Sequence, residues 1–142
     1  MTIRCCFLLP ALLLAAAAGC GGGRTIGGSG TVVTPTNSDF KTQVQPIFDR
    51  NCALSGCHAT DSASGDMILD ADKSYANLVN VVSSEVAPDK RVVPGNSGVS
   101  YIIEKLTQTA PRSGDRMPLG GDPLPDDQIN IIKKWIDDGA KP

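Results

Sequence analysis

The sequence is poor in aromatic residues and holds a single histidine. Its 142 residues include one tryptophan, two tyrosines and three phenylalanines, against 15 glycines and 10 prolines. So few large side chains make a thin apolar core for a domain of about 100 residues. A bound apolar group would help to fill such a core.

The chain also lacks a strongly basic stretch. From Asp39 onward it has 15 acidic and 11 basic residues, with the two signs interspersed. Because nucleic-acid binding normally leaves a basic stripe, we exclude that class of partner. The length allows one domain, which we place at residues 39–142.

The N-terminal residues have the pattern of an export signal. Arg4 precedes an apolar run, from Phe7 to Ala18, that is too short to cross a bilayer as a permanent helix. A single positive charge followed by a short apolar run is typical of secretory signals. We therefore predict a signal peptide over residues 1–19.

The signal ends in Ala-Ala-Gly-Cys, which resembles the lipobox of bacterial lipoproteins. The resemblance implies that Cys20 is lipidated, becomes the first residue of the mature chain and tethers it to a membrane. An ordinary signal peptide cut nearby is the alternative. Residues 20–38 continue as a flexible linker rich in Gly, Ser, Thr and Pro, with a reach of roughly 25 Å. We expect the domain on the periplasmic side of a bacterial membrane or on the cell surface.

Apolar residues recur at helical spacing in four places, which predicts an all-α domain. The first helix places four apolar residues on one face: Phe40, Val44, Ile47 and Phe48. Ser38 or Asp39 is positioned to cap this helix, and Pro46 is expected to kink it or shorten its hydrogen bonding. A second, weaker pattern runs from about Asp70 to Val81.

The third and fourth helical patterns are clearer. The third begins with Ser97 as N-cap and has the apolar stripe Val99, Ile102, Ile103 and Leu106. The fourth runs from about Asp126 to Asp138, with two aspartates at its positive end and Gly139 as its stop. Its apolar face is Ile129, Ile132, Trp135 and Ile136. No strand stands out, and Arg91 to Val93 is the one candidate for a short strand.

Residues 107–125 separate the last two helices and have neither helical nor alternating spacing. The segment contains four prolines and several turn signals. A structureless stretch of this length is uncommon in a compact domain unless it serves a function or wraps something. We therefore expect it to cover a filled space.

Two cysteines and the only histidine lie close together in NCALSGCH, Asn51 to His58. Cys-x-x-Cys-His is the attachment pattern of c-type haem, in which two thiols add to vinyl groups and the following histidine binds iron. Here four residues separate Cys52 from Cys57, so the extra residues must bulge outward. Gly56 is able to take the positive φ that such a bulge needs. The spacing alone leaves haem attachment and a Cys52–Cys57 disulfide both open.

Other interpretations of the motif explain less. A disulfide leaves His58 without a role. A zinc site would need a carboxylate as its fourth ligand. Thiol redox chemistry normally uses a two-residue spacer beside a thioredoxin-like pattern, which this chain lacks.

A haem bound by His58 needs a sixth ligand for electron transfer, and methionine is the usual partner where no second histidine exists. Beyond the signal the chain has two methionines, Met67 and Met117. Met117 lies in the long loop, where Pro118 favours an extended backbone that presents the thioether. Met67 stands beside Ile68 and Leu69, as a core-filling residue would. We therefore expect Met117 to be the ligand.

Four segments support a family resemblance. Val44 to Ile47 (VQPI) precede the Cys-His motif, and RVVPGNS (residues 91–97), RMP (116–118) and IKKWIDDGA (132–140) follow it. In this order they resemble the small monohaem cytochrome c-like domain of exported bacterial proteins. The resemblance covers about residues 39–142.

The resemblance implies an all-α, cytochrome c-like fold with about four helices around one haem, long irregular loops, and first and last helices that cross. It implies that Cys52 and Cys57 anchor the haem as thioethers. It also implies His58 as the proximal iron ligand and Met117 as the distal one.

We accordingly predict a one-electron carrier rather than an enzyme. The mixed-sign surface indicates brief docking with redox partner proteins. Should Met117 dissociate, an open iron would bind peroxide or a small gas, but the chain offers no distal histidine or acid–base pair for catalysis. The alternative function is a haem-free surface lipoprotein, with a Cys52–Cys57 disulfide, acting as a binding module.

Overall fold

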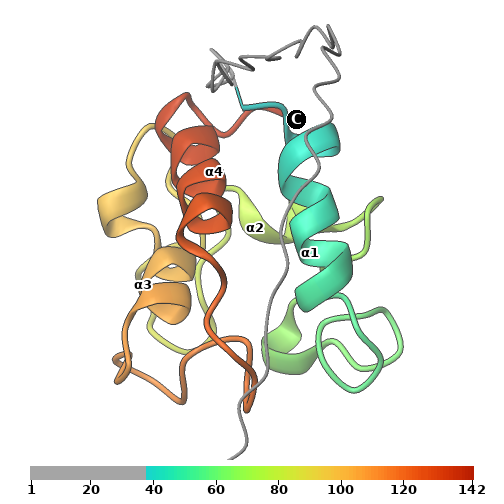
Figure 1. Ribbon diagram of the computed structural model, residues 1–142. Coiled ribbons are helices and arrows are strands. Elements are labelled where there is room, and N and C mark those ends of the chain that lie inside the picture. Colours follow the sequence, from blue (N-terminus) through green and yellow to red (C-terminus); the bar gives the residue numbers. More distant parts are fainter. Residues whose placement is uncertain (1–37) are drawn as a thin grey trace, which may run out of the picture. The chain divides into compact units, whose positions relative to one another are not determined.

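The computed structural model describes residues 38–142, which form an all-α fold as predicted (Figure 1). Four α-helices occur in this part of the chain: α1 (Gln45–Asn51), α2 (Ser74–Leu78), α3 (Tyr101–Thr107) and α4 (Asp126–Asp137). A π-helical turn, η1 (Phe40–Val44), and two short 3-10 turns, η2 (Ser64–Asp66) and η3 (Ser97–Val99), complete the regular structure. The predicted signal peptide, the lipidated Cys20 and the linker up to residue 37 lie outside the described residues.

The first predicted helix changes from π-helical to α-helical hydrogen bonding between Val44 and Gln45, just before Pro46. Before it, the backbone N–H of Gln45 donates to Phe40 O, five residues back, in the π-helical pattern. Pro46 has no N–H to donate and stands in the first turn of α1, where proline is tolerated. Asp39 caps the start, since its carboxylate accepts from the Thr42 N–H at 2.9 Å. The cap is as predicted, and the hydrogen bonding of the helix changes beside Pro46 while the backbone remains helical.

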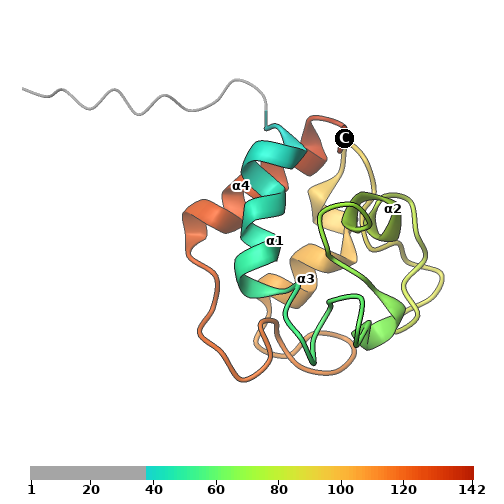
Figure 2. The same ribbon diagram turned by 90° about the vertical axis from the view of Figure 1, so that its right-hand side faces the viewer.

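Helix α4 packs against η1, and Figure 2 shows the first and last helical segments crossing. The Trp135 and Phe40 rings meet with centroids 4.9 Å apart. The whole apolar face predicted for α4 is buried, and Gly139 ends the helix at φ 102°. Burial of aromatic side chains of this size stabilises a fold by several kcal/mol.

The third predicted helix starts later than expected, and Ser97 is not its N-cap. Ser97 belongs to η3, and its hydroxyl donates to the Asp137 carboxylate of α4 at 2.9 Å. Ser100 precedes α3 instead. Val99, predicted to face the core, is 55% exposed. The hydrogen bond to Asp137 holds η3 against the end of α4. Helix α3 therefore begins only at Tyr101.

The second predicted helix is shorter than Asp70 to Val81. It covers only Ser74–Leu78, because Val79 is extended and forms a parallel bridge with Val92. The β-branched residues that follow favour extended backbone. Val82 and Lys90 form a second, antiparallel bridge. Within residues 38–142 these bridges remain isolated, so the candidate strand at Arg91 to Val93 does not form.

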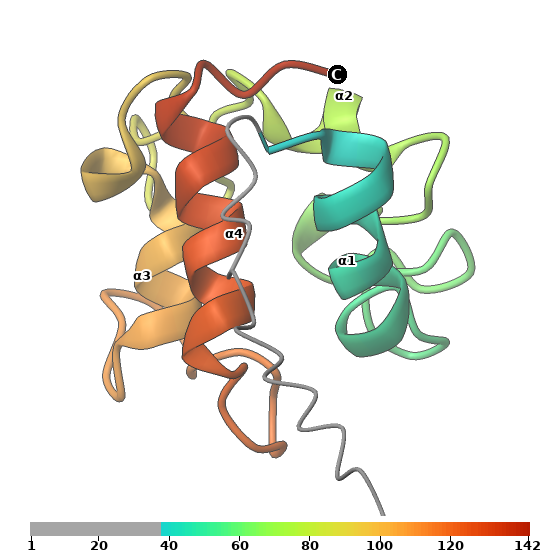
Figure 3. The same ribbon diagram turned by 45° about the horizontal axis from the view of Figure 1, so that its top comes forward.

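The long segment after α3 is irregular as predicted: residues 108–125 contain neither helix nor strand. In Figure 3 it passes below α3 and α4, on the side of the molecule where α1 ends. Among the described helices, none is both long and apolar enough to cross a membrane.

Candidate functional site

The four predicted site residues line one cavity. It has a volume of about 410 Å³ and lies between the end of α1, helix α3 and the loop 108–125. The residues from the motif and the loop that face it include Cys52, Cys57, His58 and Met117. Buried apolar side chains, among them Phe48, Leu69 and Leu106, form its inner wall. A volume of this order is typical of small-molecule and cofactor pockets, about 300–1,000 Å³.

A second cleft, of about 540 Å³, is lined by residues between Pro88 and Arg112. It contains none of the predicted site residues. The chemistry that the sequence indicates is therefore gathered in the first cavity.

The segment between the two cysteines bulges outward, as predicted. The His58 N–H donates to the Cys52 carbonyl at 3.1 Å and so closes the loop at its base. Leu54, Ser55 and Gly56 project from it and are exposed. Gly56 has φ +81°, with no atom within 4 Å of the position that a Cβ would occupy. The extra residues thus form a surface loop, and Cys52 and Cys57 remain on the cavity.

The two thiols are free and differ in environment. Cys52 is half-buried and packs against the core, whereas Cys57 is exposed. Burial, and secondarily the neighbouring Cys57, raise the pKa of the Cys52 thiol to about 12. The Cys52–Cys57 disulfide, one of the two possibilities allowed by the spacing, is not formed in this structure.

His58 is held from two sides by the segment that follows. Its ring nitrogen Nδ1 lies 3.3 Å from the Met67 carbonyl oxygen, and its own carbonyl accepts from the Leu69 N–H at 2.7 Å. A carbonyl only accepts, so the hydrogen bond requires the proton on Nδ1. In a neutral imidazole Nε2 then keeps its lone pair, which is the arrangement of a metal-ligating histidine.

Arg91 fixes the segment that holds His58. Its guanidinium is buried and donates to the carbonyls of Gly65 (2.9 Å), Asp66 (3.1 Å) and Asn77 (2.9 Å). Desolvation lowers the pKa of Arg91 from its ordinary value, yet arginine stays charged at any physiological pH. The buried guanidinium therefore links η2 to α2 by hydrogen bonds, and η2 directly precedes the residues that contact His58.

Met117 lines the cavity from the loop 108–125, far along the chain from His58. Its backbone N–H donates to the Lys105 carbonyl of α3 at 2.7 Å, and its side chain is half-buried against the core. Met67 also lines the cavity and packs on the core. The structure thus brings His58 together with both candidate methionines.

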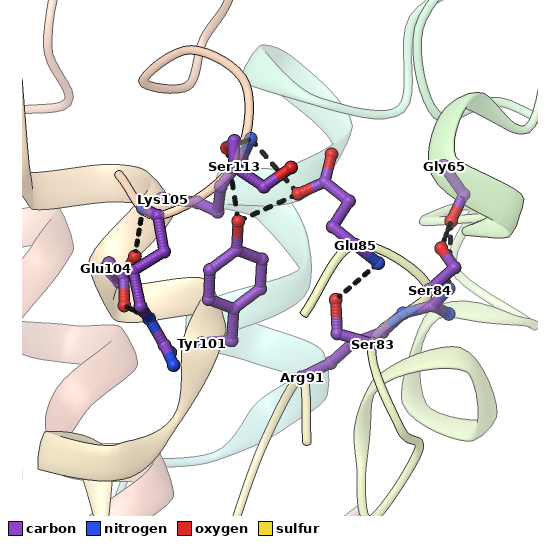
Figure 4. Close-up of polar contacts among 10 residues, drawn as sticks. Gly65, Ser83, Ser84, Glu85, Arg91, Tyr101, Glu104, Lys105 and Ser113 are labelled. Carbon is purple, nitrogen blue, oxygen red and sulfur yellow. Dashed lines mark hydrogen bonds and ion pairs between the residues drawn. The ribbon is translucent and has the colours of Figure 1, made fainter. Parts of the chain in front are cut away.

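One wall of the cavity is polar, which the sequence analysis missed. Glu85, Tyr101 and Lys105 meet there (Figure 4). Burial, followed by the hydrogen bond to Glu85, raises the pKa of Tyr101 to about 12. Tyr101 and Lys105 are four residues apart on α3 and share one face, a spacing visible in the sequence. Glu85 lies too far along the chain for any local pattern to reveal it.

The donor set is unusual for a metal site made by protein alone. Between residues 38 and 142, no three His, Cys, Asp or Glu side chains are grouped to hold a metal ion. An imidazole and a thioether are ligands that bind haem iron, and two thiols are the groups through which a c-type haem is attached. Comparisons with protein-family models, with curated proteins and with solved structures found no match to this chain.

Proposed function

We propose that this protein is a c-type cytochrome with a cytochrome c-like fold, which carries single electrons and is tethered to a bacterial membrane through Cys20. The observation that carries the proposal is the meeting of Cys52, Cys57, His58 and Met117 on one apolar cavity. His58 and Met117 are far apart in sequence. Their meeting is not a consequence of the local motif.

The geometry around His58 supports iron ligation by Nε2. A ligating histidine almost always donates its other ring N–H to a carbonyl or carboxylate. The Met67 carbonyl, 3.3 Å from Nδ1, takes that role. Leu69 and Arg91 hold the segment behind the ring, so its orientation is set before any ligand binds.

The same contact favours Met117 over Met67 as the sixth ligand. The Met67 backbone lies on the Nδ1 side of the His58 ring. The Met67 main chain is thus already engaged in orienting the ring that would hold the haem through Nε2. Met117 is attached instead to α3 through the Lys105 carbonyl, and it lines the same cavity. Met117 would therefore be the thioether that holds the haem from a segment independent of the one that orients His58.

The bulged loop is compatible with attachment through both thiols. Cys57 is exposed and Cys52 faces the cavity, so each thiol is accessible to a vinyl group during maturation. The raised pKa of Cys52 keeps this thiol protonated at neutral pH, and a protonated thiol is slow to form a disulfide by exchange.

The chain supplies ligands and excludes water. Apolar side chains of α1 and α3 close the inner wall, and the loop 108–125 contributes Met117, Pro118 and Leu119 to the lining. A haem with histidine and methionine ligands, when bound, takes up and releases one electron at a raised reduction potential. If His58 and Met117 both hold the haem, the chain would leave no open ligand position for a substrate, which suits a carrier rather than an enzyme.

Expression of the full chain in a bacterium that exports and matures c-type cytochromes tests the proposal. We expect a coloured protein whose ferrous form has a sharp α-band that carbon monoxide leaves unchanged. Ready carbon monoxide binding would indicate an open iron and a ligand-binding function. A colourless protein would contradict the proposal and leave the disulfide-linked binding module as the alternative.

A further inference from the structure

Lys105 is a buried cation on the wall of the candidate haem cavity. The residue is 8% exposed, and lysine is almost never fully buried without a partner. Its ammonium pairs with the Glu85 carboxylate at 3.2 Å. An ammonium has three N–H donors, so the pair with Glu85 leaves others free to bind a second acceptor.

The ammonium also donates to the carbonyl oxygen of Ser113, at 3.0 Å. Ser113 belongs to the irregular loop that carries Met117. The Tyr101 hydroxyl, which donates to Glu85 at 2.9 Å, lies 3.2 Å from the same Ser113 oxygen. Figure 4 shows Glu85, Tyr101 and Lys105 converging on Ser113. The loop is thus fastened to α3 at this point by a charge-assisted hydrogen bond.

The backbone of Lys105 fastens the loop a second time. Its carbonyl accepts from the Met117 N–H at 2.7 Å. The same residue therefore holds the loop on both sides of Gly114, at Ser113 through its side chain and at Met117 through its main chain. Among the described residues, it alone joins α3 to Met117 by a backbone hydrogen bond.

Gly114 leaves room for the Lys105 ammonium beside the loop backbone. It has φ +60°, and a Cβ at this position would lie 3.2 Å from the Lys105 ammonium nitrogen. The absence of a side chain lets the ammonium lie against the loop backbone. This observation is independent of the hydrogen bonds and indicates that the loop and Lys105 fit each other closely.

We infer that Lys105 is a positioning residue for Met117: it clamps residues 113–117 to α3 and so keeps the thioether over the cavity. Its role at the iron rests on the proposed function. With haem bound, loss of the clamp would let the Met117 thioether release the iron more often. The loosened loop itself is measurable whether or not haem is present.

The first test compares Lys105→Met with Lys134→Met in the purified exported protein. Lys134 is the matched control, because it also pairs with a carboxylate, Asp138 at 2.9 Å, but lies on α4 outside the cavity. We expect Lys105→Met to speed hydrogen exchange of the Met117 amide about tenfold, as befits the loss of one buried charge-assisted hydrogen bond. It should also increase carbon monoxide binding by the ferrous protein and weaken the absorption band of thioether-ligated ferric haem. Lys134→Met should change none of these.

A second pair of variants covers the case in which Lys105→Met does not fold. Gly114→Ala pushes the ammonium away from Ser113, while Gly120→Ala, at φ +69° in the same loop, meets no atom within 4 Å. Both impose similar backbone strain, so only Gly114→Ala should speed exchange of the Met117 amide. Equal exchange within each pair would overturn the inference. A colourless wild type would remove the proposed function, and the exchange measurement would still decide the clamp.

Discussion

The Nδ1 atom of His58 lies 3.3 Å from the backbone carbonyl oxygen of Met67. This contact links the single histidine to the segment that Arg91 ties to α2. It favours the neutral tautomer with the proton on Nδ1, in which Nε2 is free to bind a metal, and it places the Met67 backbone next to Nδ1. The assignment of the two methionines follows from that placement.

Removal of each methionine thioether should therefore have different effects. Met117→Ala should keep the haem attached, lower its reduction potential and allow carbon monoxide to bind the ferrous iron, because methionine ligation raises the potential and fills the sixth position. Met67→Ala should mainly lower stability, by about 2–5 kcal/mol at most, through loss of packing. Potentiometry and carbon monoxide titration of both variants check this. An unchanged reduction potential in Met117→Ala would show that Met117 is not the iron ligand.

The two thiols should react at different rates in protein prepared without haem. At pH 8 the raised pKa of Cys52, about 12, leaves little thiolate, and the side chain is half-buried. Cys57 is exposed. Because the thiolate is the reacting form, iodoacetamide should modify Cys57 at least about tenfold faster. Peptide mass spectrometry measures both rates, and unfolding in urea should make them similar. Equal rates in native buffer would be inconsistent with the burial of Cys52.

The bulge between the cysteines should depend on Gly56. Its φ of +81° is unfavourable for a residue with a Cβ, although nothing crowds the position. Gly56→Ala should therefore lower the free energy of unfolding by about 1–2 kcal/mol through backbone strain alone. Asparagine tolerates this conformation better, so Gly56→Asn serves as the control with a smaller loss. Urea denaturation measures both, and a neutral Gly56→Ala would argue against the bulge.

Stability at high pH should depend on Tyr101. Its pKa is raised from 10.0 to about 12 in the folded protein. The unfolded chain therefore loses this proton at lower pH than the folded one, and deprotonation favours unfolding. The stabilisation is fully present below pH 10 and is lost as the pH rises towards 12. Tyr101→Phe should flatten the pH profile of stability in this window. Identical profiles for the two proteins would show that the phenol does not titrate there.

The sequence predicted those parts of the fold that depend on local spacing. Helix α4 has a complete apolar face and a glycine stop, and it forms between nearly the predicted bounds. The second helix was overextended because the pairing of Val79 with Val92 overrides its weak helical pattern. Ser97 was misassigned as a cap because its partner, Asp137, lies on another helix. Each miss reflects a tertiary contact that competes with a local preference.

In the site, too, the sequence revealed the residues of local motifs but not the contacts between distant segments. Cys52, Cys57 and His58 form a local motif, and Met117 stands out in a loop without other structure. The carbonyl that orients His58, the buried Arg91 and the clamp of Glu85, Tyr101 and Lys105 arise from segments distant in sequence. Backbone carbonyls in particular leave no trace in a sequence pattern. Such supporting contacts required the structure.

The mass of one tryptic peptide tests the central claim most directly. Cleavage after Arg50 and Lys73 releases residues 51–73, which contain Cys52, Cys57 and His58 but not Cys20, so the lipid does not contribute to its mass. From the exported, matured protein we predict a coloured peptide heavier than its sequence by one haem. A colourless peptide with the mass of its sequence, or lighter by the two hydrogens lost on forming a disulfide, would contradict the account.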